Sequence, residues 1–144
     1  MKKLLIFVLL VFFMFSITAC SGGSEPKPPT EEDNKLAEML TNKEGEVWQH
    51  YIEDDYSLVA LEFLPDGTYQ YYYCFVEWEL HPHVGKWQIS DGKLYITYSE
   101  DQTGISSIKF EDGKLILKDL NGKNKGKTKT YITVQKPENI VVKE

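Results

Sequence analysis

The sequence predicts an all-β domain: a small antiparallel up-and-down barrel of about eight strands with a short N-terminal helix. Turn signals recur along the chain: Asp66-Gly67, Asp91-Gly92, Asp112-Gly113 and Asn121-Gly122. Such dipeptides supply the positive φ angles that tight hairpins need. Between them lie alternating apolar and polar runs typical of half-buried strands. Because the links are short, successive strands must run antiparallel.

The N-terminus predicts export. Lys2 and Lys3 precede an apolar run over residues 4–17, which is the pattern of a secretory signal. The run is too short for a transmembrane helix, which needs roughly 20 apolar residues. We therefore assign residues 1–19 to a signal peptide.

The signal ends in Ile17-Thr18-Ala19-Cys20, which resembles the lipobox of bacterial lipoproteins. The resemblance implies cleavage before Cys20, lipid on its sulfur and a place in the cell envelope, attached to the membrane by that lipid. Ser21 in the next position implies the outer membrane of a diderm cell, with the periplasmic or the surface face left open. The alternative is a soluble secreted protein whose cysteine occurs there by chance.

Residues 20–30 are rich in Gly, Ser and Pro and predict a flexible tether. Without residues 1–19 the chain has 14 lysines, no arginine and 22 acidic residues, a formal charge of −8. This composition argues against nucleic acid, whose binding depends on cation–phosphate contacts. Any membrane contact would come from the lipid alone, and we expect a monomer.

A short helix is predicted over 31–42, since Thr30 is a good N-cap and the acidic residues that follow suit the positive end of a helix. Leu36, Met39 and Leu40 form one apolar stripe. We expect this helix to cover one end of the β domain.

Strands are predicted within a domain over 31–136, and residues 137–144 form a C-terminal tail. The predicted ranges are 46–52, 57–64, 67–78, 84–90, 93–98, 104–110, 113–119 and 128–136. Several carry one apolar face, among them Val59 with Leu61 and Ile132 with Val134. Closing into a barrel buries that face and removes free edges; a two-sheet sandwich is the alternative.

The longest predicted strand is aromatic on both faces. Tyr69, Tyr71 and Tyr73 alternate with Tyr72 and Cys74. A second apolar face is either covered by another segment or exposed as a contact surface. With Cys20 bound to lipid, Cys74 has no intrachain disulfide partner, and we expect it to be buried rather than reactive.

Several segments together resemble the small lipocalin-like lipoproteins common in Bacteroidetes. The matching segments are Gly45 with Trp48, Phe63-Leu64-Pro65-Asp66-Gly67-Thr68-Tyr69, Gly85-Lys86-Trp87 and Asp91-Gly92-Lys93-Leu94. The resemblance spans about residues 36–136 and implies a lipocalin-like barrel more than any activity. Two features differ from lipocalins: two residues separate Gly45 from Trp48, and the domain is shorter.

Candidate chemistry is sparse. His81 and His83, near Glu77 and Glu79 in a predicted loop, could hold a transition metal, but two solvated loop histidines are the simpler interpretation. The acidic pairs 54–55 and 100–101 do not match a calcium loop. No catalytic motif or cofactor signature is present, so we expect no enzyme, no cofactor and no metal.

The sequence therefore predicts a lipid-anchored barrel that binds a small apolar or aromatic ligand in its mouth or on its aromatic strand. The candidate ligand-binding residues are Tyr71, Tyr73, Trp78 and Trp87. The alternative is an envelope protein-interaction or inhibitor module with no small-molecule site. A barrel interior packed solid by large aromatic side chains would favour that alternative.

Overall fold

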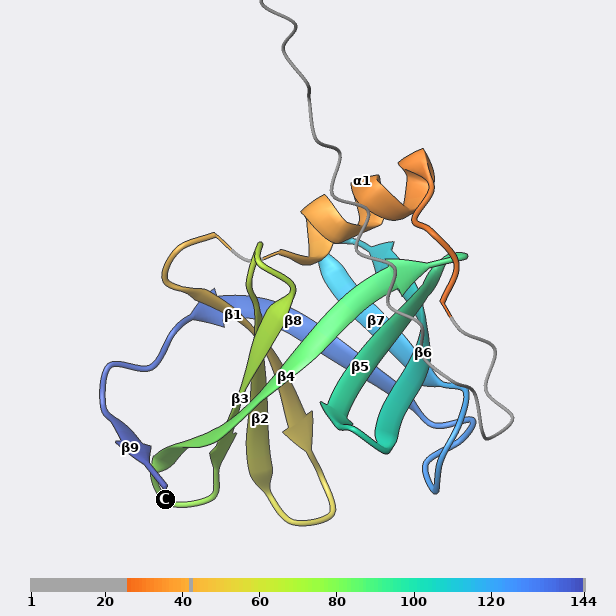
Figure 1. The fold of residues 1–144 in the computed structure, drawn as a ribbon. Coiled ribbons are helices and arrows are strands. Elements are labelled where there is room, and N and C mark those ends of the chain that lie inside the picture. Colours follow the sequence, from red (N-terminus) through yellow and green to blue (C-terminus); the bar gives the residue numbers. More distant parts are fainter. Residues whose placement is uncertain (1–25, 42, 144) are drawn as a thin grey trace, which may run out of the picture.

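Each of the first eight strands pairs with its neighbours in sequence, and the eighth strand returns to the first (Figure 1). The computed structural model describes residues 26–41 and 43–143, without the side chains of residues 81–84. In this part, eight antiparallel strands close into a barrel, which confirms the predicted fold class and excludes the sandwich. The elements are α1 (Glu31–Leu40), β1 (Glu46–Ile52), β2 (Ser57–Phe63), β3 (Thr68–Cys74), β4 (Trp78–Ser90), β5 (Lys93–Ser99), β6 (Gln102–Glu111), β7 (Lys114–Asp119), β8 (Thr128–Gln135) and β9 (Ile140–Val142).

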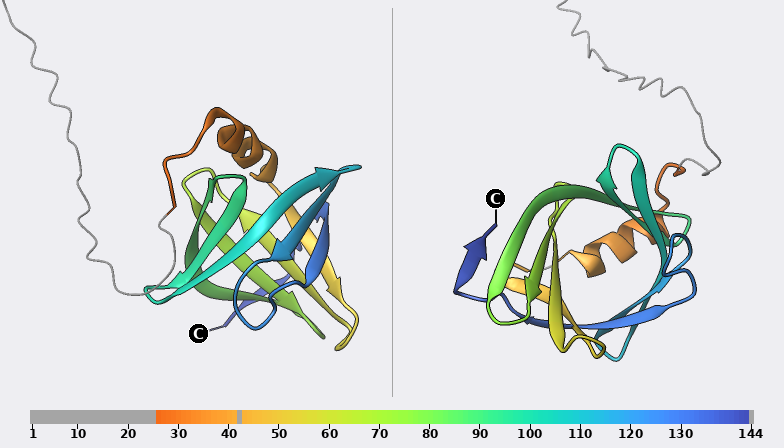
Figure 2. Two further views of the ribbon diagram at one scale, coloured as in Figure 1. Left: turned by 90° about the vertical axis from the view of Figure 1, so that its right-hand side faces the viewer. Right: turned by 90° about the horizontal axis from the view of Figure 1, so that it is seen from below.

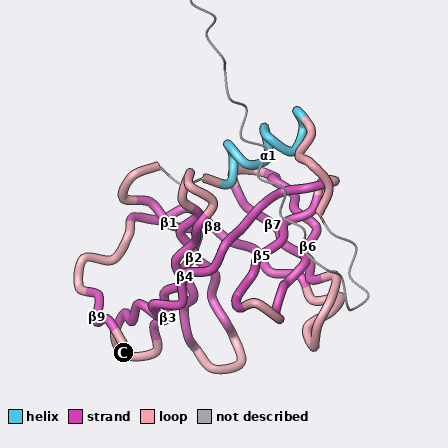
Figure 3. Tube along the Cα trace, in the orientation of Figure 1, coloured by secondary structure: helices cyan, strands magenta, loops and turns pink. Residues whose placement is uncertain are grey.

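The helix and the ninth strand lie outside the ring. Viewed along the barrel axis, the strands form a closed outline, with α1 across the far end and β9 against the outer side (Figure 2). Strands dominate the described chain, and α1 is one short segment among them (Figure 3). The molecule therefore has a covered end, which carries α1, and an opposite end, which we call the mouth.

Two of the three Asp-Gly turns have the backbone that two-residue hairpins require, and Asp66-Gly67 does not, because only Gly67 has a positive φ there. Asp91 and Gly92 have φ angles of 54° and 67°, and Asp112 and Gly113 have 51° and 73°. Two consecutive positive φ angles define the type I′ turn, whose twist matches that of the flanking strands. These turns fix the predicted hairpins β4–β5 and β6–β7 at the covered end.

The helix begins where predicted and ends two residues earlier. Thr30 and Asp33 form a reciprocal capping box, and the indole Nε1 of Trp48 donates to the Leu40 carbonyl at 2.8 Å. One part of the predicted stripe is wrong: Met39 is 53% exposed, while Ala37 joins Leu36 and Leu40 against the core. The prediction that the helix covers one end of the β domain is confirmed.

The segments 63–69 and 85–87 meet at the covered end of β3 and β4. The Trp87 backbone N–H donates to the Gly67 carbonyl at 2.8 Å, and its indole donates to the Leu64 carbonyl at 3.1 Å. The Phe63 and Trp87 rings pack edge to face at 5.6 Å. The turn at Gly67 is thereby attached to β4, which helps to close the barrel between β3 and β4.

Strand β4 corrects the predicted boundaries. The sequence predicts one strand over 67–78 and a loop at 81–83, whereas β3 ends at Cys74 and residues 78–90 form one strand. Tyr71 pairs with His81 and Tyr69 with Gly85, so β4 carries extra residues at this point. Such a bulge accommodates Pro82, which lacks the N–H that a regular ladder requires.

Strand β8 turns the opposite face inward from the one predicted. Tyr131 is buried in the barrel, whereas Ile132 is exposed and Val134 packs on the outside. The register explains this orientation, because Val134 pairs with the outward Val47. The apolar alternation was read correctly as a strand, but the choice of face depends on what covers the outside.

A second, smaller apolar cluster lies outside the barrel. Its buried members are Val47, Ala60 and Tyr72, and partly buried neighbours include Trp78 and Ile140. The outward face of the aromatic strand is thus covered by the C-terminal segment, where β9 pairs in parallel with the start of β4. The predicted tail contributes this strand.

Residues 1–25, with the predicted signal peptide, Cys20 and most of the tether, lie outside the described residues. Within the described range, no helix combines the length and the apolar character required to cross a bilayer. Cys74 is a free cysteine. It is half-buried, whereas the sequence analysis predicts that it is buried.

Candidate functional site

The barrel interior is packed at its covered end and hollow at its mouth. The packed part contains large buried side chains, among them Leu40, Trp48, Phe63 and Leu94. The hollow part is a cavity of about 640 Å³ beside the β1–β2 turn and the β7–β8 loop. This volume lies within the range of roughly 300–1,000 Å³ typical of small-molecule sites.

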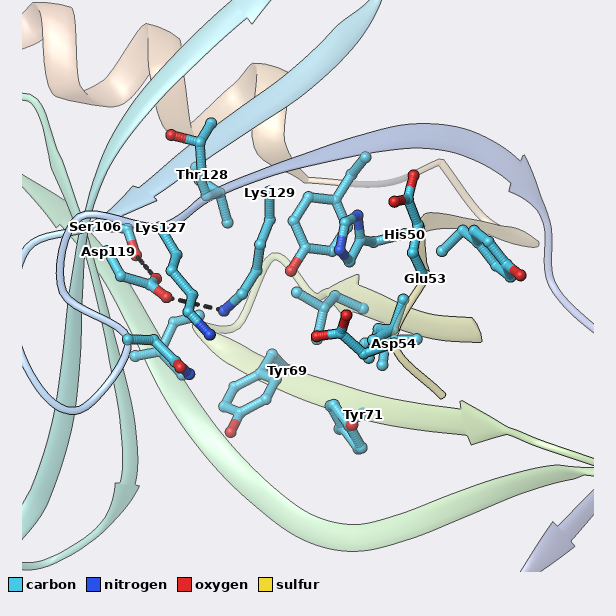
Figure 4. A pocket seen from close by; sticks show the side chains of 18 of the residues that line it. His50, Glu53, Asp54, Tyr69, Tyr71, Ser106, Asp119, Lys127, Thr128 and Lys129 are labelled. Atoms are coloured by element: carbon cyan, nitrogen blue, oxygen red, sulfur yellow. Dashed lines mark hydrogen bonds and ion pairs between the residues drawn. The ribbon is translucent and has the colours of Figure 1, made fainter. Parts of the chain in front are cut away.

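Tyrosine side chains from several strands line the cavity. Tyr69 and Tyr71 point inward from β3 (Figure 4). Tyr98 from β5 and Tyr131 from β8 also line the cavity. The Tyr69 and Tyr98 rings meet edge to face at 6.2 Å, and the Tyr131 ring lies 5.2 Å from the His50 ring. Burial raises the pKa of the Tyr69 and Tyr131 phenols well above the ordinary value, so both act as neutral hydrogen-bonding groups near neutral pH.

A polar group stands on the part of the cavity wall formed by three adjacent strands, β6, β7 and β8. The Asp119 carboxylate accepts from the Ser106 hydroxyl at 3.1 Å and pairs with the Lys129 ammonium at 2.9 Å. Ser106 is directly opposite Asp119 in the β6–β7 register. All three residues line the cavity (Figure 4). The wall thus offers a partly exposed ammonium whose position is fixed by a carboxylate.

Further charges stand at the rim. Glu53 and Asp54, just after β1, line one side of the cavity, and Lys127, just before β8, lines another. The β7–β8 loop that carries Lys127 is fixed by Asn121, whose side chain accepts from the Ile105 N–H and donates to the Thr103 carbonyl, both at 2.8 Å. The rim is therefore partly preorganised.

A second hollow adjoins the first. It has a volume of about 560 Å³ and lies between the β5–β6 turn and the β7–β8 loop. Tyr98, Asp119, Asn124 and Lys129 line both hollows. A ligand at the mouth thus has room to extend past Tyr98.

The structure separates the four predicted ligand-binding residues. Tyr71 lines the cavity. Tyr73 packs against the barrel core, and Trp87 packs against that core at the covered end. Trp78 belongs to the outer cluster. The aromatic strand therefore contributes to the site through its inward face.

Sequence reasoning missed most of the polar site residues: His50, Ser106, Asp119 and Lys129 lie on four different strands. Their inward orientation follows from the pairing register. The sequence indicates this orientation only through the two-residue spacing that places Asp119 on the same face as Leu117 in β7 and Lys129 on the same face as Tyr131 in β8.

The described side chains form no cluster that matches the candidate metal sites. Within that part of the chain, no three His, Cys, Asp or Glu side chains gather in a metal-binding arrangement. His81 and His83 lie within β4, and their side chains are outside the description. The Asp55 carboxylate accepts from the Ser57 N–H and hydroxyl, which stabilises the β1–β2 turn.

Comparison with known proteins found no matching family model, no matching curated protein and no matching solved structure. The site is therefore interpreted from its own geometry.

Proposed function

We propose that this chain is a lipid-anchored, lipocalin-like binding protein of the bacterial envelope that holds a small ligand with an apolar or aromatic ring at its barrel mouth. The cavity carries this proposal. It combines about 640 Å³ of space with tyrosine walls and a few fixed polar groups, which is the usual composition of a small-molecule site.

The distribution of packing favours a ligand site over the interaction-module alternative. An interior filled along its whole length would leave no room for a ligand. Here Trp48 and Phe63 fill the covered end, whereas the inward side chains beyond them on the same two strands, His50 and Val59, line open space. The short barrel is thus divided between a core and a site.

The membrane part of the proposal depends on the N-terminal sequence. Cleavage before Cys20 and acylation of its sulfur would attach the domain to the envelope, and Ser21 favours the outer membrane. More than one acyl chain is needed for stable anchoring. The acidic domain itself contributes no attraction to anionic lipids.

Native mass spectrometry of the full-length protein purified from its own host tests this function. We expect a small-molecule adduct on the wild type and a lipid mass that is lost in Cys20→Ser. Tyr71→Ser should lose most of the small-molecule adduct, because it removes a ring from the cavity wall.

The matched control is Tyr56→Ser, since Tyr56 is 77% exposed and does not line the cavity. Thermal unfolding of each variant separates loss of ligand from loss of fold. A folded Tyr71→Ser protein that keeps its adduct, or a wild type that carries none, would contradict the ligand site. A lipid mass that persists in Cys20→Ser would contradict the anchor.

A further inference from the structure

We propose that the ligand is a small zwitterion with an apolar or aromatic body. Its anionic group meets Lys127 and Lys129, and its cationic group meets Glu53 and Asp54. This inference rests on the proposed function and narrows its ligand class. A short peptide with free termini and aromatic side chains has this chemistry.

The first observation is an excess of positive charge on one wall. Lys129 and Asp119 compensate each other through their 2.9 Å ion pair. Lys127 adds a second ammonium, and its backbone is held by hydrogen bonds to Asp119 and to Asn124. Asp119 cannot neutralise both lysines, so this wall attracts an anion.

The second observation is an excess of negative charge on the β1–β2 turn. Of its three consecutive acidic residues, Asp55 is engaged with Ser57. Glu53 and Asp54 are exposed, line the cavity and form no ion pair with any side chain that the structure describes. This side attracts a cation.

The third observation is that the two charged sides face the same cavity without neutralising each other. Figure 4 shows Lys127 and Lys129 on one side and Glu53 and Asp54 on the other, with Tyr69 and Tyr71 along the floor between them. No ion pair joins the two sides among the described side chains. A ligand with a single charge is attracted by one side and repelled by the other, whereas a ligand with two opposite charges is attracted by both.

The tyrosines suit the middle of such a ligand. Tyrosine rings pack against apolar and aromatic groups and also attract a cation through the ring face. The buried phenols of Tyr69 and Tyr131 stay neutral, so they add no charge to the cavity. The ligand class is therefore set by two separated charges and an apolar contact between them.

Isothermal titration calorimetry tests the charge requirement. The acylated mature protein would be held in nanodiscs of phosphatidylglycerol, which has no cationic group to compete. The probes are the dipeptide Phe-Phe, its N-acetyl form without the cation and its C-terminal amide without the anion. We expect Phe-Phe to bind and each capped form to bind at least about tenfold more weakly, since one charge-assisted contact is worth about that factor.

Charge variants assign each end of the ligand. In Lys127→Met the advantage of Phe-Phe over the amide should shrink, and in Glu53→Gln with Asp54→Asn its advantage over the acetylated form should shrink. The control variants are Lys125→Met and Glu100→Gln, which change exposed charges near the mouth that do not line the cavity; both should retain the wild-type preference.

The outcomes separate this inference from the proposed function. Equal binding of all three dipeptides would overturn the zwitterion and leave a site for apolar rings. Failure of all three to bind would also overturn it, while the adduct seen by native mass spectrometry decides the proposed function independently. Weaker binding of both capped forms, with the assigned losses in the variants, would support it.

Discussion

Gly85 shows how one residue without a side chain shapes the barrel interior. A Cβ at this position would lie 2.0 Å from Cε1 of Tyr69 and 2.6 Å from the Thr97 carbonyl. Both distances are far below van der Waals contact. The Tyr69 ring therefore lies directly across the β4 backbone, and this is how a large aromatic residue fits into a short barrel.

Gly85→Ala should destabilise the protein by about 2 kcal/mol, the typical cost of overfilling a packed interior. Because Tyr69 must move, its ring contact with Tyr98 at the cavity should also be lost. Urea unfolding measures the first effect, and the aromatic NMR signals of Tyr69 report the second. An unchanged free energy of unfolding would show that the backbone relaxes at no cost.

Single residues of the site differ in how far the sequence could predict them. Tyr71 was predicted because its strand is unusually aromatic. Asp119 and Ser106 were not, because a lone Asp or Ser in a strand carries no signal of its partners. Only the β6–β7 register places them opposite each other, and that register depends on the whole hairpin.

Among the secondary-structure elements, β9 is the one that the sequence analysis left within a tail. It pairs through only three residues with β4, yet it covers the outer cluster around Val47 and Tyr72. At Tyr72, the Glu62 carboxylate accepts from the phenol hydroxyl at 2.6 Å and pairs with Lys136 at 2.7 Å. Burial, together with the hydrogen bond to Glu62, raises the pKa of Tyr72 to about 12.

Ile140→Ser should lower the free energy of unfolding by about 1 kcal/mol, because a half-buried isoleucine leaves its apolar contacts. Val142→Ser in the same strand is the matched control, since Val142 is 61% exposed and should change stability little. Chemical denaturation of both variants makes the comparison. Equal effects would mean that β9 does not cover the outer cluster.

The strands were largely predictable because Asp-Gly turns and alternation are local signals. The predictions differ from the structure where contacts with distant segments determine which face is buried or whether a segment forms a strand. Ile132 and Val134 were placed inside because they are apolar, yet the outside of β8 is itself partly covered. The loop predicted at 81–83 became strand because a bulge accommodates Pro82. Neither the cover nor the bulge is visible in the local pattern.

For the molecule as a whole, Asp33 connects the helical cover to the barrel. Its carboxylate accepts from the Thr30 N–H at 2.8 Å within the helix cap and from the Gly92 N–H at 2.9 Å in the β4–β5 turn. Asp33 is only 2% exposed. Hydrogen bonds lower the pKa of Asp33 from 3.8 to about 2. The largest contribution comes from the Thr30 backbone N–H, and the next comes from the Gly92 backbone N–H.

A folded-state pKa below the unfolded value means that the ionised form stabilises the native state. This contribution is fully present above about pH 4 and should be lost as the pH falls towards 2. In urea unfolding, the wild type should therefore have a clearly higher free energy of unfolding than Asp33→Asn at pH 7. This difference should shrink between pH 4 and pH 2. Glu32 is an exposed neighbour, so Glu32→Gln should have the same free energy of unfolding as the wild type at each pH. A pH-independent difference would contradict the role of the charge.

The position of α1 at the covered end has a consequence for access. The described chain enters the domain through this helix, at the end of the barrel opposite the cavity. If Cys20 is acylated as proposed, the attachment to the bilayer lies on the side of α1, and the opening of the cavity is free to face the aqueous space. Cargo would then arrive from the surrounding fluid rather than by partitioning out of the membrane.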